Sequence, residues 1–221
     1  MKQLCVLLAA LMSVFSCINI FAEDGRRLCL AAQDGNWALV SGELARGADV
    51  NYVLPYSGWT ALQYAAKYCE LTAVCQLLLK GANTNLPNQY DQTPLHLAAS
   101  GGSAAIAVKL ISAGADVHAV DRFGDTPLHK AAFNNHYTVV QILLGAGARV
   151  DARNRSGHTP LHRASLYTYD SEVVRLLLDA GADREAIDRA GKKPALQESG
   201  SVALEGEGSV HSLFCALGWC R

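Results

Sequence analysis

The 221-residue chain lacks the short motifs on which common enzyme classes depend. It contains no GxSxG nucleophile motif, no HExxH zinc motif and no GxxxxGK phosphate loop. Clusters of basic residues are also absent, and the formal net charge is −1. Because phosphate backbones are bound by clustered Lys and Arg, nucleic acid is not an expected partner. These absences predict a non-enzymatic protein.

Metal-binding cysteine pairs are absent as well, since none of the seven cysteines belongs to a CxxC motif. Cys215 and Cys220 are close enough in sequence to form a small disulfide loop in an oxidising compartment, and Cys69 and Cys75 flank a predicted turn between helices. The alternative is that these residues are free thiols, which are common in protein interiors. We expect no metal and no cofactor.

The sequence does contain a motif that recurs every 33 residues. Thr93-Pro94-Leu95-His96-Leu97-Ala98-Ala99 returns at 126–132 and at 159–165, and a degraded copy occupies 60–66. Thr is a favoured helix N-cap and Pro a favoured first helical residue. The residue three positions after the cap can bond back toward the turn, as in a capping box. Each copy therefore predicts the start of a helix.

A second helix is expected in each unit, because apolar residues at spacings of three and four precede a Gly-Ala pair. The glycines that are expected to end these helices in the left-handed conformation are Gly47, Gly81, Gly114, Gly147 and Gly181. Helices of about 8–12 residues are marginal in isolation. Their stability must therefore come from packing against neighbouring units.

The motifs TPLHxAA and GADVN resemble those of ankyrin repeats, over about residues 25–198. The resemblance implies an all-α solenoid of about five helix–turn–helix units, with β-turn or hairpin loops and a partial C-terminal cap. The chain departs from the pattern at Ala61 and Gln63, which replace Pro and His, and at Cys69 and Asn135, which replace the glycine between helices. One extra residue also enters the loop at 52–59 and the turn at 166–170.

The resemblance divides the chain into consecutive units. These are a signal peptide or N-terminal anchor at 1–22, repeat one (the N-terminal cap) at 25–53, repeat two at 54–90, repeat three at 91–123, repeat four at 124–156, repeat five at 157–190, a partial sixth repeat at 191–198, and a flexible hinge with an apolar tail at 199–221. The tail is expected either to cover the last repeat or to dock on another protein.

The N-terminal segment has the pattern of a signal peptide, with Lys2 followed by an apolar run and a small-residue site at Ala22. The sequence ending at Cys17 resembles a loose bacterial lipobox, which predicts lipidation there as an alternative. A third possibility is an uncleaved anchor, because 4–22 is just long enough to span a thin bilayer. We expect export, to the periplasm of a bacterium or to an equivalent compartment outside the cytosol.

The repeated histidines His96, His129 and His162 are not expected to bind a metal ion. One repeat apart, they fall on stacked helices whose axes lie about 8–10 Å apart. Zn–N bonds are about 2.0–2.1 Å long, so one ion does not bridge two of these histidines. A structural role at the helix start is the favoured interpretation.

In ankyrin repeats the loop tips and the outer face of the first helix form a concave surface for protein recognition. Mapped by register, the implied binding residues are Tyr56, Trp59, Lys67, Tyr68, Gln89, Tyr90, Gln92, Arg122, Phe123, Phe133, Asn134, Arg155, His158 and Tyr167. Exposed aromatic residues and Arg are typical of interaction hot spots. The resemblance thus implies an exported module that binds another protein; the alternative is a membrane-tethered structural or protective factor whose tail makes the contacts.

Overall fold

The computed structural model describes residues 23–166 and 172–196. The predicted signal peptide or anchor, with Cys17, lies outside these residues. So do Tyr167, most of the turn at 166–170, and the hinge and tail at 199–221 with Cys215 and Cys220.

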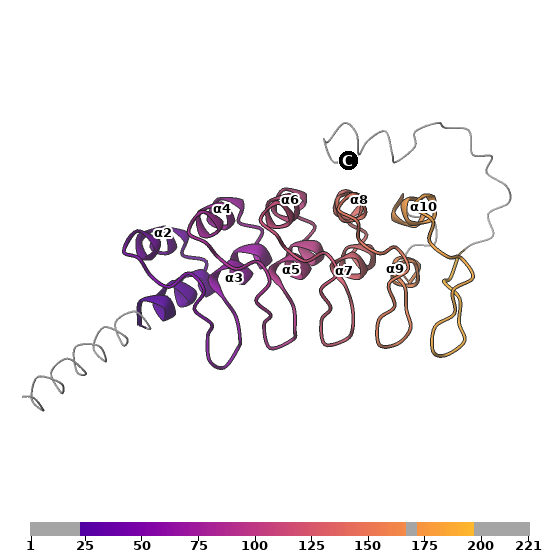
Figure 1. Cartoon of the computed structure of the whole chain (residues 1–221), viewed down its shortest axis with the longest axis horizontal. Coiled ribbons are helices and arrows are strands. Elements are labelled where there is room, and N and C mark those ends of the chain that lie inside the picture. Colours follow the sequence, from indigo (N-terminus) through magenta and orange to yellow (C-terminus); the bar gives the residue numbers. More distant parts are fainter. Residues whose placement is uncertain (1–22, 167–171, 197–221) are drawn as a thin grey trace, which may run out of the picture.

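The described residues form pairs of short helices stacked side by side in two rows (Figure 1). Residues 23–33 are helical and are followed by α2 (Trp37–Ala45). The other pairs are α3 (Ala61–Lys67) with α4 (Leu71–Leu79), α5 (Pro94–Gly101) with α6 (Ala104–Ser112), α7 (Pro127–Phe133) with α8 (Tyr137–Gly145), and α9 (Pro160–Ala164) with α10 (Glu172–Asp179). The predicted all-α solenoid is confirmed.

The first helices α3, α5, α7 and α9 form one row, and the loops project from that side of the array (Figure 1). No strand occurs within residues 23–166 or 172–196, so the predicted hairpins are present only as tight, hydrogen-bonded turns. We call the surface formed by these loops and first helices the inner-helix face.

The core runs along the array because each unit adds the same kind of side chain to it. Leu95, Leu128 and Leu161 are fully buried, and each is followed by small alanines that are buried too. A narrow Ala-lined face lets the first helices of neighbouring repeats pack closely. The outer helices contribute matching pairs such as Val140 and Leu143. Each unit therefore buries its apolar face only against its neighbours, as a solenoid requires.

The turn between the two helices has a left-handed residue in each of the first four repeats. Repeats one and three use Gly35 and Gly102, with φ of 70° and 74°. Cys69 and Asn135 adopt φ of 57° at the equivalent positions. Asn tolerates this conformation far better than Cys. Both replacements of glycine therefore keep the fold, but the left-handed conformation costs more free energy at Cys69 than at Asn135.

The cysteines in the described part of the chain, Cys29, Cys69 and Cys75, are free thiols. Cys69 and Cys75 therefore do not form the disulfide that their sequence positions allow. Among the described residues, no helix is both long and apolar enough to cross a bilayer.

Candidate functional site

Each of the loops at 87–92, 120–125, 153–158 and 187–193 is shaped by an Asn or Asp at one register position. Asn88 accepts hydrogen bonds from the backbone N–H of Tyr90 and Gln92, at 2.8 and 3.0 Å. Asp121 does the same for Phe123 and Asp125, also at 2.8 and 3.0 Å. Asn154 and Asp188 repeat the arrangement in the next two loops. Such side-chain bonds to the backbone two residues on define a tight turn.

Backbone hydrogen bonds join every loop to the next one. The N–H of Arg122 donates to the carbonyl of Tyr90 at 3.0 Å, and the N–H of Arg155 donates to that of Phe123 at 2.9 Å. The same bond links the loops before and after these. Gly124 permits the approach, because a Cβ there would lie 2.8 Å from the nitrogen of Arg155. The loop tips are thus cross-linked along the array.

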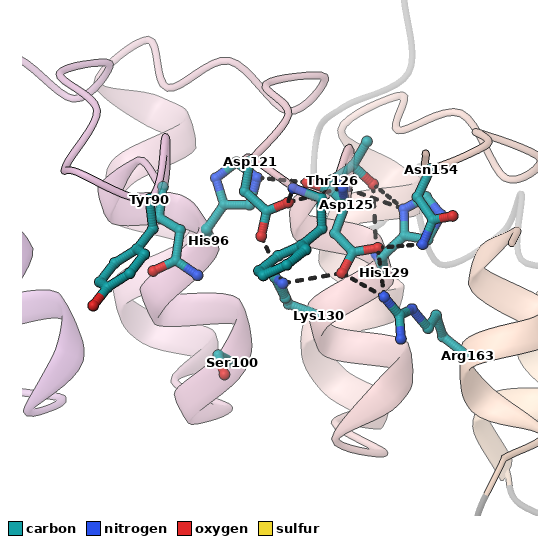
Figure 2. Close-up of polar contacts among 12 residues, drawn as sticks. Tyr90, His96, Ser100, Asp121, Asp125, Thr126, His129, Lys130, Asn154 and Arg163 are labelled. Atoms are coloured by element: carbon teal, nitrogen blue, oxygen red, sulfur yellow. Dashed lines mark hydrogen bonds and ion pairs between the residues drawn. The ribbon is translucent and has the colours of Figure 1, made fainter. Parts of the chain in front are cut away.

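The histidine of each TPLH motif adds a second connection between repeats (Figure 2). Nδ1 of His96 accepts from the backbone N–H of Thr93 at 3.2 Å, and Nε2 lies 3.0 Å from the carbonyl of Asp125 in the next repeat. Because Nδ1 accepts, the proton of the neutral ring is on Nε2. His129 and His162 form the same pair of bonds. The structural role predicted for these residues is therefore seen directly.

These bonds require that the imidazole rings are neutral. The pKa values of all three histidines are lowered, which favours the neutral form. Burial lowers the pKa of His96 to about 4, although the carbonyl of Asp125 opposes the shift. Burial also lowers the pKa of His129 and of His162 below the ordinary value. Protonation of Nδ1 would remove the acceptor that caps the helix. Among the described residues, no group of three His, Cys, Asp or Glu side chains is arranged to hold a metal ion.

Gln63 takes the place of histidine in the second repeat without loss of the bonds. Its Oε1 accepts from the backbone N–H of Thr60 at 2.8 Å, and its Nε2 donates to the carbonyl of Gln92 at 3.1 Å. The capping box that results is complete. The departure from the motif therefore changes the residue but not the geometry.

An ionic cluster lies between the loops and the first helices, and it consists of Asp121, Asp125, Lys130, Asn154 and Arg163 (Figure 2). Nζ of Lys130 lies 2.6 Å from Asp121 and 3.0 Å from Asp125. Asp125 also binds Nη2 of Arg163 at 2.8 Å and accepts from the Asn154 amide at 2.7 Å. Three consecutive repeats are therefore tied together by two buried carboxylates.

The cluster keeps the Asp125 carboxylate charged. Burial alone raises the pKa of Asp125, but hydrogen bonds from Asn154 and Lys130, with the charges of Lys130 and Arg163, outweigh it. The resulting pKa lies below the ordinary value. Lys130 and Arg163 are thus partly exposed on the inner-helix face, and the buried carboxylates of Asp121 and Asp125 balance their charge.

Beside the cluster, the inner-helix face is hollowed into an open pocket of about 350 Å³. Its lining residues come from two loops and from α5, α7 and α9: Gln92, Ser100, Phe123, Asp125, Lys130, Phe133, Asn134 and Arg163. Lys130 lies over the ring of Phe123 and Arg163 over that of Phe133, with 5.6 and 5.8 Å to the ring centroids. The arrangement suits a side chain that is partly apolar and partly polar.

Most residues predicted to bind a partner are accessible on this face. The exposed ones are Tyr56, Lys67, Tyr68, Gln89, Tyr90, Arg122, Phe123 and Arg155, and the half-buried ones are Gln92, Phe133, Asn134 and His158. Phe123 is 58% exposed and Tyr90 40% exposed. His158 has a partner already, because its Nε2 lies 3.2 Å from Asp188.

Trp59 differs from the expectation that it is exposed. Only 9% of it is accessible, and its ring lies 4.8 Å from that of Tyr64 and 5.2 Å from Nζ of Lys67. The ring packs against α3, on which Tyr64 and Lys67 lie. Trp59 therefore belongs to the core rather than to an accessible binding surface.

Sequence reasoning did not find the ionic cluster. Asp125 and Arg163 are 38 residues apart, and Asp125 and Asn154 are 29 apart, so no local motif connects them. The sequence does contain one signal for the cluster. An Asn or Asp recurs five residues before the Thr of each TPLH motif, at Asn88, Asp121 and Asn154.

Comparison with known proteins points to one family. The family profile described as "Ankyrin repeats (3 copies)" matches residues 28–121 and 105–188. A stretch of 74 residues, 34% of this chain, is 31% identical to part of the Neurogenic locus Notch protein of Drosophila melanogaster. Over 74 residues the chain is 30% identical to part of the Neurogenic locus notch homolog protein 1 of Xenopus tropicalis. The matched stretch covers only 3% of the length of either relative.

The family profile spans most of the chain, and it matches the same residues that form the stacked helix pairs and the cross-linked loops. Ankyrin repeats act as non-catalytic modules for protein–protein interaction. This chain belongs to the ankyrin repeat family.

Proposed function

We propose that the inner-helix face binds a partner protein, with the exposed aromatic residues of the loops as its anchors and the ionic cluster as its rigid base. The observation that carries the proposal is that Tyr90 and Phe123 are exposed on loops whose backbones are bonded to their neighbours. An exposed aromatic ring on a fixed backbone binds without a large ordering cost. Large aromatic side chains are also enriched at the energetic centres of interfaces.

We expect that both anchors can be removed without unfolding. The bonds between loops use the carbonyls of Tyr90 and Phe123, not their rings. Replacement of both residues by Ala therefore keeps the loop connections. The pocket beside the ionic cluster loses its wall at Phe123.

The test compares the variant Tyr90→Ala/Phe123→Ala with a matched control, Tyr137→Ala. Tyr137 is 37% exposed and lies at the start of α8, in the outer row. Affinity capture followed by quantitative mass spectrometry identifies proteins bound by the unaltered chain, and binding is then measured with the purified partner. We expect the double variant to lose at least about tenfold in affinity, and the control to bind normally.

Unchanged partner binding by the double variant would reject the inner-helix face as the binding surface. Circular dichroism and thermal melting accompany the measurement. A variant that fails to fold would instead place Tyr90 and Phe123 in the core.

Export is part of the proposal, and it rests on the sequence of the first 22 residues alone. Cleavage after Ala22 would release the repeat array into the periplasm or the medium. N-terminal sequencing of the protein recovered from each cell fraction tests this, since a mature chain that begins at Glu23 is expected.

The alternative role is a membrane-tethered structural or protective factor that contacts partners through its C-terminal tail. The sequence Val14-Phe15-Ser16-Cys17 favours it, because a lipobox ends in the cysteine that carries the lipid. Incorporation of radiolabelled palmitate that is lost in Cys17→Ala would support tethering. Retention of the whole chain in membranes without label would favour an uncleaved anchor.

A further inference from the structure

Three successive loops carry an exposed arginine at the same register position. Arg122, Arg155 and Arg189 each follow the Asn or Asp that shapes the loop. We call these three residues the arginine row. The loop before them has Gln89 at this position, so the row begins in the third repeat.

The backbone of the row is held in place. The N–H of Arg155 donates to the carbonyl of Phe123 at 2.9 Å, and that of Arg189 donates to Ser156 at 3.0 Å. Their side chains start over the preceding loop, because a Cβ on Gly124 would lie 3.1 Å from Cγ of Arg155, and one on Gly157 would lie 3.2 Å from Cγ of Arg189. The side chains of Arg155 and Arg189 therefore begin in the same direction, and all three arginines share one register position.

The nearby carboxylates do not neutralise the row. Asp121 and Asp125 are buried beneath Lys130 and Arg163 in the ionic cluster. The carboxylate of Asp188 is engaged as well, because it lies 3.2 Å from Nε2 of His158.

Arg122 donates to the carbonyl of Gln89 and lies over the ring of Tyr90, so it keeps its charge without an acidic partner. The guanidinium groups of Arg155 and Arg189 form no ion pair or hydrogen bond with any described residue. The row is accordingly a set of charged donors at the surface.

Charge is distributed unevenly along the loops. The loops at 120–125, 153–158 and 187–193 contain six basic and three acidic residues, so this part of the surface is positive although the whole chain is not. The loops at 54–59 and 87–92 contain no basic residue and only Asp91 as an acidic one. The N-terminal loops of the inner-helix face thus carry aromatic residues and little charge, whereas the C-terminal loops carry more basic than acidic residues.

We infer that the arginine row binds an acidic polypeptide segment whose carboxylates recur at every third residue. The inference rests on the proposed function and specifies the chemistry of the partner. Packed helices lie about 8–10 Å apart, which sets the spacing of the arginines. A polyproline II segment rises about 3.1 Å per residue with three residues per turn, so every third side chain lies on one side at about 9 Å intervals. Guanidinium groups bind carboxylates through paired hydrogen bonds.

A β-strand fits this row less well, because its successive side chains point to opposite faces and residues three apart do not share a face. A preference for carboxylates at every third residue therefore distinguishes specific docking from general attraction between opposite charges. It also gives the experiment its internal control.

The experiment measures binding of two fluorescein-labelled peptides to the full chain by fluorescence anisotropy at low and physiological salt. The first peptide is four Glu-Pro-Pro units in tandem, and the second has the same composition with its four glutamates consecutive. We expect the periodic peptide to bind more tightly, and its binding to weaken with salt.

The double variant Arg155→Gln/Arg189→Gln should weaken binding of the periodic peptide by roughly 2- to 30-fold, which corresponds to two exposed ion pairs. The matched control is Arg149→Gln. Arg149 is exposed in the turn after α8 and forms no ion pair with a described residue, so the loss of its one charge, against two in the double variant, should leave binding within about twofold. Both variants replace Arg by a shorter, uncharged side chain that still forms hydrogen bonds, and circular dichroism verifies their folding.

Equal affinity for the two peptides, or equal effects of the two variants, would overturn the inference. Tighter binding of a twelve-residue oligothymidylate that depends on Arg155 and Arg189 would overturn it as well, in favour of a nucleic-acid backbone. A separate outcome tests the proposed function. If the periodic peptide does not bind while the captured partner still depends on Tyr90 and Phe123, only the acidic-segment inference is rejected.

Discussion

Gln63 in the second repeat and His129 in the fourth differ in shape and in acid–base chemistry, yet they reach the same two kinds of backbone group. Gln63 connects the N–H of Thr60 to the carbonyl of Gln92. His129 connects the N–H of Thr126 to the carbonyl of His158. The position therefore requires one acceptor and one donor at a fixed separation, and not an imidazole ring.

The comparison also shows what the histidines add. An amide does not titrate near neutral pH, whereas an imidazole does. The third, fourth and fifth repeats can therefore lose their connections when the pH falls, while the junction made by Gln63 does not. The two halves of the array should differ most under acid conditions.

The largest expected effect is acid destabilisation. The pKa of His96 is about 4 in the folded chain, against an ordinary value near 6.5, so the unfolded chain binds more protons between these values. Stability is then fully present above about pH 6.5 and is lost as the pH falls toward 4. His96 alone accounts for about 3 kcal/mol at pH 4, and the lowered pKa values of His129 and His162 act in the same direction.

Urea denaturation at pH 7, 5.5 and 4 measures this loss. The matched variant is His96→Gln, which copies the second repeat and should lose clearly less stability between pH 7 and pH 4. An identical pH profile for both proteins would show that His96 is not the titrating group. Protonation of Asp125, whose pKa is also lowered, should add to the loss only below about pH 4.

Replacement of a connecting histidine by an apolar residue should have the next largest effect. His129→Leu leaves the N–H of Thr126 and the carbonyl of His158 without a partner in a buried site. An unpaired buried polar group costs about 1–3 kcal/mol, so we expect a loss of about 2–4 kcal/mol at pH 7. Equilibrium unfolding in urea gives the difference.

The control for this change is His129→Gln, which keeps an acceptor and a donor. Its loss should stay within about 1 kcal/mol. If Leu and Gln prove equally destabilising, packing of the ring and not its hydrogen bonds explains the requirement at His129.

A smaller, stabilising effect is expected at the turn between α3 and α4. Cys69 has a φ of 57°, a conformation that costs a non-glycine residue about 1–2 kcal/mol. Glycine removes this cost but loses more backbone entropy on folding. Cys69→Gly should therefore stabilise the protein by about 0.5–1 kcal/mol, measured by thermal and urea unfolding.

Asn135→Gly is the matched change in the fourth repeat, where φ is also 57°. Its gain should be smaller, because Asn tolerates the left-handed region. A larger gain at Asn135 than at Cys69 would contradict the assignment of strain to Cys69.

The smallest effect is expected when the second repeat is given the proline of the others. Proline at the first helical position is normally favourable. In this repeat, however, the backbone N–H of Ala61 hydrogen-bonds the thiol of Cys29, and proline would remove that donor. Ala61→Pro should therefore change stability by no more than about 0.5 kcal/mol. In a Cys29→Ala background, where no thiol is present, the same change should be stabilising.

The helix starts could be predicted from sequence because their determinants are only three residues apart. Thr126 caps α7, proline occupies the first helical position, and His129 completes the box, all as the pattern indicates. The left-handed conformations of Cys69 and Asn135 could be predicted for the same reason, since register alone places them in the turn.

The candidate surface could be predicted only in part. Tyr90 and Phe123 are exposed as expected, because their register positions are loop tips. Trp59 could not be placed correctly, because register gives the position of a residue and does not show that its ring packs against Tyr64. The ionic cluster was not predicted at all, since Asp125 meets Arg163 across 38 residues.

The repeat motif alone specifies an ankyrin array, because the caps and stops that define each helix lie within one unit. Stacking of the repeats settles which side chains remain accessible, which carboxylates are buried beneath Lys130 and Arg163, and that the side chains of Arg155 and Arg189 begin in the same direction. The physical reason is that caps depend on neighbours along the chain, whereas burial and charge balance depend on atoms brought together by stacking.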